Sequence, residues 1–219
     1  LLEEKKIVEL HQELNDNDYA VGDIYIAKVK KLVSGLNAAF VDVGYEKDAF
    51  LHYFDLGPQI LSCTKFVNSV FASNSFQEIE KISLEQDIEK NGTITSVLNT
   101  GQKILVRIAK EPISAKGPRV TSELSLPGRF IVLVPFSNKV SISQKIKDVE
   151  ERNRLKRLVQ SIRPNNFGVI VRTVAENRKV AELDTDLNDL LKKWNDMISK
   201  IPNSQLPSKV HGELGRSFT

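Results

Sequence analysis

The first half of the chain alternates apolar and polar residues with the period of two that is typical of β-strands. The stretch 24–33 (IYIAKVKKLV) has this pattern, a Ser-Gly pair interrupts it, and 36–43 (LNAAFVDV) resumes it. Gly44 ends that run, and a third run begins at 49–53 (AFLHY). Strand patterns this close together along the chain predict a β-meander.

Residues 54–92 lack this alternation. A Gly-Pro pair and several Ser and Asn residues, followed by an acidic, polar run, predict a long insertion with a short helix near 65–71, or only a linker. Strand patterns return at 103–109 (KILVRIA) and 120–126, on either side of the loop KEPISAKGPR. Five short strands with one long insertion before the last two predict a five-stranded OB-type barrel, whose strand faces and loops bind oligonucleotides. A fold alone does not fix function.

The second half has a different pattern. Residues 129–136 (RFIVLVPF) and 167–174 form apolar runs, as in strands that are buried on both faces. Each run precedes a stretch with apolar residues on one helical face, at 144–162 and 183–198. Strand, helix, strand, helix predicts an α/β module. The whole chain is therefore expected to be α+β and multi-domain.

Both ends look like pieces of something larger. A strand pattern over 5–14 is separated from the barrel by NDNDYAVGD, and the polar segment from Pro202 onward has no recognisable domain end. No apolar run approaches the roughly 18 residues that a membrane span needs, and the first residues lack a secretory signal. The cytoplasm is therefore the expected location.

Composition and charge restrict the chemistry. A lone cysteine, Cys63, excludes an intramolecular disulfide, and with three scattered histidines it argues against a motif-spaced zinc site. The net charge of +3 is too small to indicate a polyanion partner by itself. The stretch 103–129 is locally basic, with six lysines and arginines against two glutamates. The predicted helix at 144–162 mixes both signs, as an ordinary solvated face does, and Trp194 is expected in the core.

Three strings, in this order, resemble the ribonuclease E/G family: VGDIYIAKVKKLVSGLNAAFVDVGYEKDAFLH, TSELSLPGRFIVLVP and FGVIVRT. The first is similar to the start of the S1-type RNA-binding barrel of that family, and the last to the centre of its 5′-sensor module. The resemblance implies the N-terminal strands of a split RNase H-like subdomain at 1–20, the barrel at 21–122, the α/β sensor at 123–205, and the start of the returning RNase H-like segment at 206–219.

The resemblance also implies what this chain lacks. The family cleaves single-stranded RNA with magnesium held by two aspartates downstream of the sensor, and it joins protomers through zinc bound by a short cysteine motif. Neither pattern is recognisable in this sequence. We therefore expect no catalytic residue, no metal site and no cleavage by this chain alone, with Mg, Zn and a possible homo-oligomer implied only for the full-length protein.

Phe40, Phe50 and Lys116 are the candidate RNA-binding residues. The two phenylalanines lie on strands that flank Gly44, and spacing alone favours a core position for them. The resemblance instead implies solvent-facing rings on which bases stack. Lys116, in the loop AKGPR, is either a solvated charge or a cation that reaches the RNA backbone beside those rings.

Arg172 and Thr173 end the string VIVRT. A guanidinium suits bidentate binding of a phosphate, and a hydroxyl adds a donor or acceptor beside it; the alternative is an arginine in a surface ion pair. The resemblance implies a pocket for a 5′-monophosphate at these two residues, with backbone contacts near Gly128 and Val132. Such a pocket would exclude a 5′-triphosphate and leave the arginine unpaired with a 5′-hydroxyl.

The expected function is therefore RNA binding and 5′-monophosphate sensing within an endoribonuclease of RNA processing and decay. The expected partner is single-stranded RNA, preferably 5′-monophosphorylated. A stand-alone RNA chaperone or translation-associated RNA-binding protein is the alternative. A complete small enzyme with an unrecognised site is a third reading, which no P-loop, nucleophile elbow or Ser-His-Asp order supports.

Overall fold

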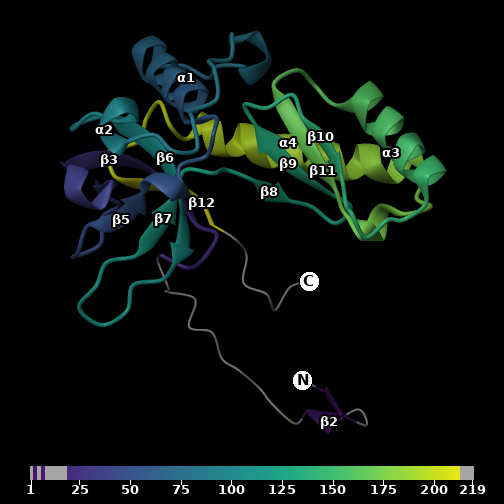
Figure 1. The fold of residues 1–219 in the computed structure, drawn as a ribbon, viewed down its shortest axis with the longest axis horizontal. Coiled ribbons are helices and arrows are strands. Elements are labelled where there is room, and N and C mark those ends of the chain that lie inside the picture. Colours follow the sequence, from purple (N-terminus) through teal and green to yellow (C-terminus); the bar gives the residue numbers. More distant parts are fainter. Residues whose placement is uncertain (1, 4–5, 8–18, 213–219) are drawn as a thin grey trace.

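The computed structural model describes residues 2–3, 6–7 and 19–212. Two sheets dominate it, and they lie side by side in Figure 1. The first contains β3 (Ile24–Val33), β4 (Ala38–Asp42), β5 (Ala49–His52), β6 (Lys103–Lys110) and β7 (Arg119–Thr121). The second contains β8 (Leu126–Pro127), β9 (Ile131–Pro135), β10 (Val140–Ile142) and β11 (Phe167–Val171).

The first sheet closes into the five-stranded barrel that the sequence predicts. Its order is β3-β4-β5-β7-β6, and β3 closes the ring because residues 24–28 pair with β6 while residues 28–33 pair with β4. β12 (Ser208–His211) adds to the start of β3. Inward-facing side chains fill the barrel, and the short helix α2 (Ile94–Val97) contributes Ile94 to this core.

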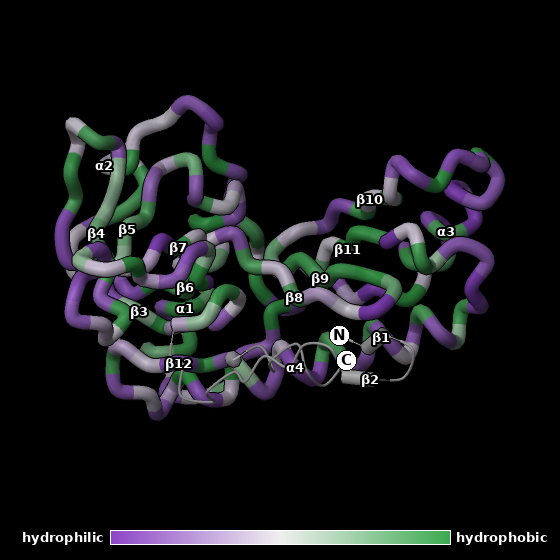
Figure 2. The backbone as a smooth tube through the Cα atoms, turned by 90° about the horizontal axis from the view of Figure 1, so that it is seen from below, coloured by the Kyte–Doolittle hydropathy of each residue, from purple (hydrophilic) through white to green (hydrophobic). Residues whose placement is uncertain are grey.

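The second sheet and two helices form the α/β module. The sheet order is β10-β11-β9-β8, and α3 (Val149–Ile162) connects the parallel pair β10 and β11. α4 (Val180–Ser199) runs behind the sheet and returns the chain to the barrel (Figure 1). In Figure 2, hydrophobic residues follow β9 while α3 is mostly hydrophilic, as expected for a helix with one solvated face.

The insertion is more ordered than the sequence indicates. Instead of a short helix near 65–71 or a linker, α1 (Ile60–Ser73) has fourteen residues. Five of its apolar residues are buried at helical spacing, namely Ile60, Cys63, Phe66, Val67 and Val70, whereas most of its Ser and Asn side chains, which suggest a loop, are exposed or half-buried. The ring of Phe66 lies 5.5 Å from Phe136 and 6.2 Å from Trp194, measured between centroids. The insertion therefore joins the barrel to the α/β module through one shared core.

Several predicted boundaries shift by a few residues. α3 begins at Val149 because Asp148 caps it by accepting a hydrogen bond from the Glu150 amide. β11 ends at Val171, and after Arg172 the chain forms a 3₁₀ turn, Thr173–Ala175. Of the strand predicted over 5–14, only β2 (Lys6–Ile7) lies within the described residues, and it pairs antiparallel with β1 (Leu2–Glu3).

Candidate functional site

Phe40 and Phe50 point out of the barrel. In β4 and β5 the residues alternate between the two faces of the strand, and the inward positions Ala39, Val41 and Leu51 are completely buried. Phe40 and Phe50 are half-buried register partners on the outer face, with ring centroids 5.8 Å apart. Core packing therefore does not account for the two rings.

A hollow of about 610 Å³ lies beside these rings. It combines two aromatic side chains with nearby lysine and arginine side chains. Its lining residues are Phe40, Lys47, Asp48, Phe50, Ala115, Lys116, Gly117 and Arg119. Phe40, Phe50 and Lys116, the three candidate RNA-binding residues named from the sequence, thus share one surface, together with residues that the sequence reasoning did not select.

A tight turn holds Lys116 at this surface. Its backbone N–H donates to the carbonyl of Ile113, whose N–H donates back to Lys116, and Ser114 between them has a left-handed φ of 51°. Next to it, Gly117 passes so close to the backbone of Lys47 and Asp48 that a β-carbon there would overlap the Asp48 carbonyl. The loop therefore packs directly against the connection between β4 and β5, which restricts where the lysine side chain emerges.

Some of the positively charged side chains around the hollow form ion pairs, and others do not. Lys30 lies 2.7 Å from Asp48 and 3.5 Å from Asp42, and these carboxylates raise the pKa of its ammonium. Arg119 donates through Nε and Nη2 to both carboxylate oxygens of Asp55. By contrast, within residues 19–212 the exposed ammonium groups of Lys47 and Lys116 form no ion pair. They are the cations best placed to meet an anionic ligand.

A β-bulge in β3 determines which lysine is the register partner of Phe40. The register between β3 and β4 shifts between Val29 and Lys31, so that Lys31 rather than Lys30 becomes the partner of Phe40. Lys31 is exposed. Strand alternation alone could not have identified it, because a slip of one residue moves every side chain to the other face.

Arg172 and Thr173 lie in the α/β module, directly after β11. The exposed Arg172 side chain donates from Nη1 to the carbonyl of Gly128, 2.6 Å away. Since a guanidinium carries five N–H donors, this bond leaves others for an anion. The Thr173 hydroxyl lies 3.0 Å from the hydroxyl of Ser143. Three of the residues named from the sequence therefore adjoin one another.

The backbone near Gly128 is already engaged. Its N–H donates to the Ile131 carbonyl at 2.8 Å, so a role as a phosphate donor would require that bond to be exchanged or shared. The next three amides, of Arg129, Phe130 and Ile131, donate to the Asp186 carboxylate. Val132 is half-buried and pairs with Ile170 on β11. No sequence pattern marks Asp186, because only the packing of α4 brings its carboxylate to these amides.

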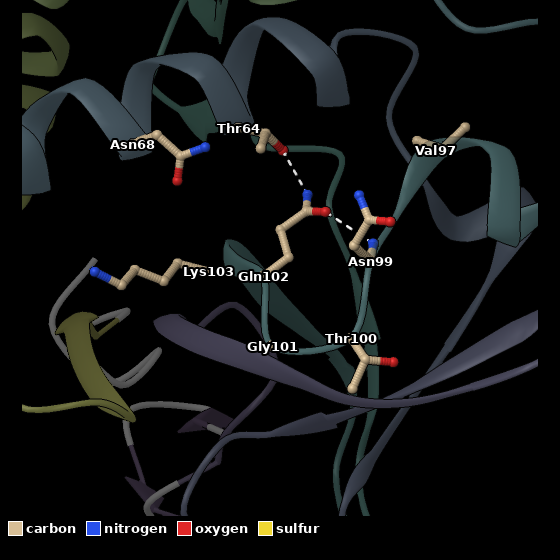
Figure 3. A pocket seen from close by; sticks show the side chains of 8 residues that line it. All are labelled: Thr64, Asn68, Val97, Asn99, Thr100, Gly101, Gln102 and Lys103. Atoms are coloured by element: carbon tan, nitrogen blue, oxygen red, sulfur yellow. Dashed lines mark hydrogen bonds between the residues drawn. The ribbon is translucent and has the colours of Figure 1, made fainter.

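A second hollow, of about 450 Å³, lies between α1 and the start of β6 (Figure 3). Amides and hydroxyls line much of it, but Gln102 is engaged at both ends, since it donates to Thr64 and accepts from the Asn99 amide. The Lys103 ammonium lies 3.6 Å from the centroid of the Phe71 ring. Without an outward-facing aromatic pair, this hollow is a weaker candidate than the one beside Phe40 and Phe50.

Two classes of site find no support in residues 2–3, 6–7 and 19–212. There, no group of three or more His, Cys, Asp or Glu side chains could hold a metal ion. None of the helices in this part of the chain is long and apolar enough to cross a membrane.

The thiol of Cys63 is buried, and burial raises its pKa to about 12.

The fold places this chain among α+β proteins with an OB-type barrel. The Ribonuclease E/G family model matches residues 125–218. The chain is 35% identical over 194 residues to ribonuclease E of Nostoc sp., covering 88% of this chain and 24% of that protein. It is 34% identical to ribonuclease G of Haemophilus influenzae, with 97% and 40% covered, and 33% identical to ribonuclease G of Escherichia coli, with 94% and 38% covered.

The chain is therefore similar to the ribonuclease E/G family, as its three sequence strings predict. It spans less than half the length of the relatives it matches. Those relatives are named as ribonucleases.

Proposed function

We propose that this chain binds single-stranded RNA on the outer face of its barrel, as the RNA-binding part of an endoribonuclease of RNA processing and decay. The observation that carries the proposal is the convergence of Phe40, Phe50 and Lys116 on one hollow. Exposed aromatic rings stack on unpaired bases of any sequence, at about 1–3 kcal/mol per base. Similarity to the ribonuclease E/G family is consistent with RNA as the ligand.

The surrounding cations would bind the RNA backbone. Lys116 and Lys47 line the hollow, and Lys31 lies opposite Phe40. Lysine–phosphate contacts release condensed counterions, so the affinity should fall steeply as salt rises. The carboxylates of Asp42 and Asp48 would repel the RNA phosphates, but Lys30 forms ion pairs with both and offsets their negative charge. The surface is therefore suited to a polyanion whose bases are exposed.

The direct test is a titration of 3′-labelled RNA, followed by fluorescence anisotropy. The wild-type chain should bind an unpaired oligonucleotide more tightly than the same strand in a duplex, where the bases are not accessible to the rings. The double variant Phe40→Ala, Phe50→Ala should lose most of this affinity. Phe76→Ala, which removes an exposed ring of the insertion that lies outside this hollow, is the matched control. Equal affinities for the double variant and the control would refute the proposal.

We propose further that Arg172 and Thr173 bind the 5′-monophosphate of the RNA. The support is the exposed guanidinium next to Gly128 and the adjacent hydroxyl, on the strand string shared with the family. A monophosphate would receive charge-assisted hydrogen bonds from the arginine. Binding at this site is separate from stacking on the barrel, so each should be removable without the other.

Oligonucleotides that differ only at the 5′ end test this second site. The 5′-monophosphate should bind more tightly than the 5′-hydroxyl and 5′-triphosphate forms, and Arg172→Lys should remove the difference because an ammonium lacks the planar fork. Equal affinities for all three ends would contradict the sensor assignment and leave a protein that binds RNA through its barrel alone. Cleavage of the RNA by the pure chain with added magnesium would contradict a binding-only role.

A further inference from the structure

An unbroken row of rings continues past the proposed RNA site. His52 lies two residues after Phe50 on the same face of β5, with the ring centroids 6.4 Å apart. Phe54 follows in the 3₁₀ turn Tyr53–Asp55, with its ring 5.1 Å from that of His52. With Phe40, four rings thus follow one another at separations of 5.1–6.4 Å.

Phe54 is the most exposed of the large hydrophobic side chains among the described residues, at 72%. Its neighbours hold it in this position. Tyr53 is buried, and its backbone N–H donates to the Asn37 carbonyl. The Phe54 amide donates to Nδ1 of His52, 3.1 Å away. Because an inward tyrosine precedes it and a side-chain acceptor binds its backbone, the phenylalanine ring is directed into solvent by the local structure.

The bond to Nδ1 also orients the imidazole. A nitrogen that accepts a hydrogen bond carries no proton, so the other ring nitrogen, Nε2, carries the N–H in the neutral form. His52 therefore offers an aromatic face for stacking and one donor for a base or phosphate oxygen.

The row ends at another hollow, of about 410 Å³, within the size range of small-ligand sites. Its walls are mainly apolar on the barrel side, and the insertion provides the other side. The lining residues are Tyr53, Phe54, Leu56, Pro58, Ile88, Glu89, Lys90 and Asn91. The Tyr53 hydroxyl donates to the carbonyl of Glu89 at 2.5 Å, so the insertion is attached at this point.

We infer that the RNA strand continues from Phe50 over His52 to Phe54 and places one or two further unpaired nucleotides there, against the hollow. This inference rests on the proposed function. RNA is favoured over a protein partner because the row is continuous with the proposed site and presents flat rings at a regular spacing rather than a broad apolar patch. Lys90 is the cation on the wall, and Arg119 is paired with Asp55, so stacking supplies most of the affinity at this end.

Oligonucleotide length separates this inference from the proposal on which it rests. OB-type folds bind about 4 to 16 nucleotides, so homopolymer RNAs across that range are titrated against the full chain. Phe54→Ala should weaken binding of the longer RNAs about 5- to 100-fold and leave the shortest one unchanged. Phe50→Ala should weaken binding at every length, Phe54→Trp should retain the long-RNA affinity, and the control Phe76→Ala should change nothing.

The outcomes are distinguishable. If Phe54→Ala matches the wild type at every length while Phe50→Ala weakens binding, the extension is wrong and the barrel site stands. If neither variant changes the affinity, the proposed function itself fails. If Phe54→Ala abolishes a concentration-dependent self-association and leaves RNA affinity intact, the ring belongs to a protein interface and the inference is overturned.

Discussion

The carboxylate of Asp186, on α4, accepts a hydrogen bond of 2.7 Å from the backbone N–H of Phe130. The amides of Arg129 and Ile131 donate to the same side chain at 2.9 and 3.0 Å. Three converging amides are the arrangement that proteins use for anions, and here a residue of the chain itself supplies the anion. Asp186 thereby fixes the turn whose Gly128 carbonyl accepts from Arg172.

Asp186→Asn should destabilise the α/β module and loosen Arg172. The side-chain NH₂ of asparagine is a donor, so it cannot accept the backbone N–H that one Asp186 oxygen accepts. Leaving such a half-buried backbone N–H without an acceptor costs about 1–3 kcal/mol. Urea unfolding should show a loss of this size, together with weaker discrimination between RNA 5′ ends. Asp189→Asn, exposed on the same helix, is the control and should change neither quantity. A variant as stable as the control would show that the three bonds contribute nothing.

Gly117→Ala should reduce RNA affinity without any change in an RNA-contacting side chain. Its β-carbon would lie 2.7 Å from the Lys47 carbonyl and closer still to that of Asp48, so the loop that carries Lys116 must move. Gly35→Ala is the matched control, because its β-carbon would meet no atom within 4 Å. Anisotropy titrations of both variants give the comparison. Unchanged affinity in Gly117→Ala would mean that the loop position is irrelevant to binding.

Lys116→Ala should lower both the affinity for RNA and its dependence on salt. Removal of one phosphate contact reduces the slope of log K against log salt by about 1. Phe50→Ala should lower the affinity with little change in this slope, because stacking releases no counterion. Lys192→Ala, an exposed lysine on α4, is the control. If Lys116→Ala leaves the slope at the wild-type value, this lysine does not touch the backbone of the RNA.

Glu151 should contribute to stability only above acidic pH. Its carboxylate accepts two hydrogen bonds from Arg154 and one from the Asn177 amide, and the Arg154 bonds in particular lower its pKa from the ordinary value of 4.5. A lowered folded-state pKa means that the contribution is present above about 4.5 and is lost as pH falls through the folded-state value. The stability difference between wild type and Glu151→Gln should therefore shrink below pH 4.5. A difference independent of pH would contradict this.

The Cys63 thiol should resist alkylation in the folded chain. Cys63 lies on the side of α1 that faces β6, and its burial there raises the thiol pKa to about 12, so almost no thiolate exists at neutral pH. Mass spectrometry after iodoacetamide treatment should show an unmodified native chain and a fully modified chain in urea. Rapid modification without denaturant would show that α1 opens readily.

The barrel could be predicted from the sequence because strand alternation is a local signal, whereas the outward position of Phe40 and Phe50 was implied only by the family resemblance, since spacing alone favoured the core. Phe40 and Phe50 flank Gly44 at matching positions, and their neighbours Ala39 and Leu51 fill the interior. Their use in RNA binding, like that of Arg172 and Thr173, stays a prediction. The domain limits stay a prediction as well, and part of the N-terminal strands lies outside the described residues.

What the sequence did not predict depends on contacts between distant residues. α1 was underestimated because its serines and asparagines resemble a loop, whereas tertiary packing of Phe66 against Trp194 decides the helix. β10 has only three residues, too few for a periodic pattern. Asp186 lies 56 positions from Phe130. Lys31 depends on a bulge that no local pattern marks.

Photo-crosslinking tests the barrel surface most directly. A 5′-monophosphorylated RNA with 4-thiouridine at each position in turn is bound to the chain and irradiated, and the modified peptides are identified by mass spectrometry. Interior positions should crosslink to the segments that contain Phe40, Phe50 and Phe54 and to the loop of Lys116, with the 5′ nucleotide near Arg172. Crosslinks confined to α3 or to the hollow between α1 and β6 would contradict the account.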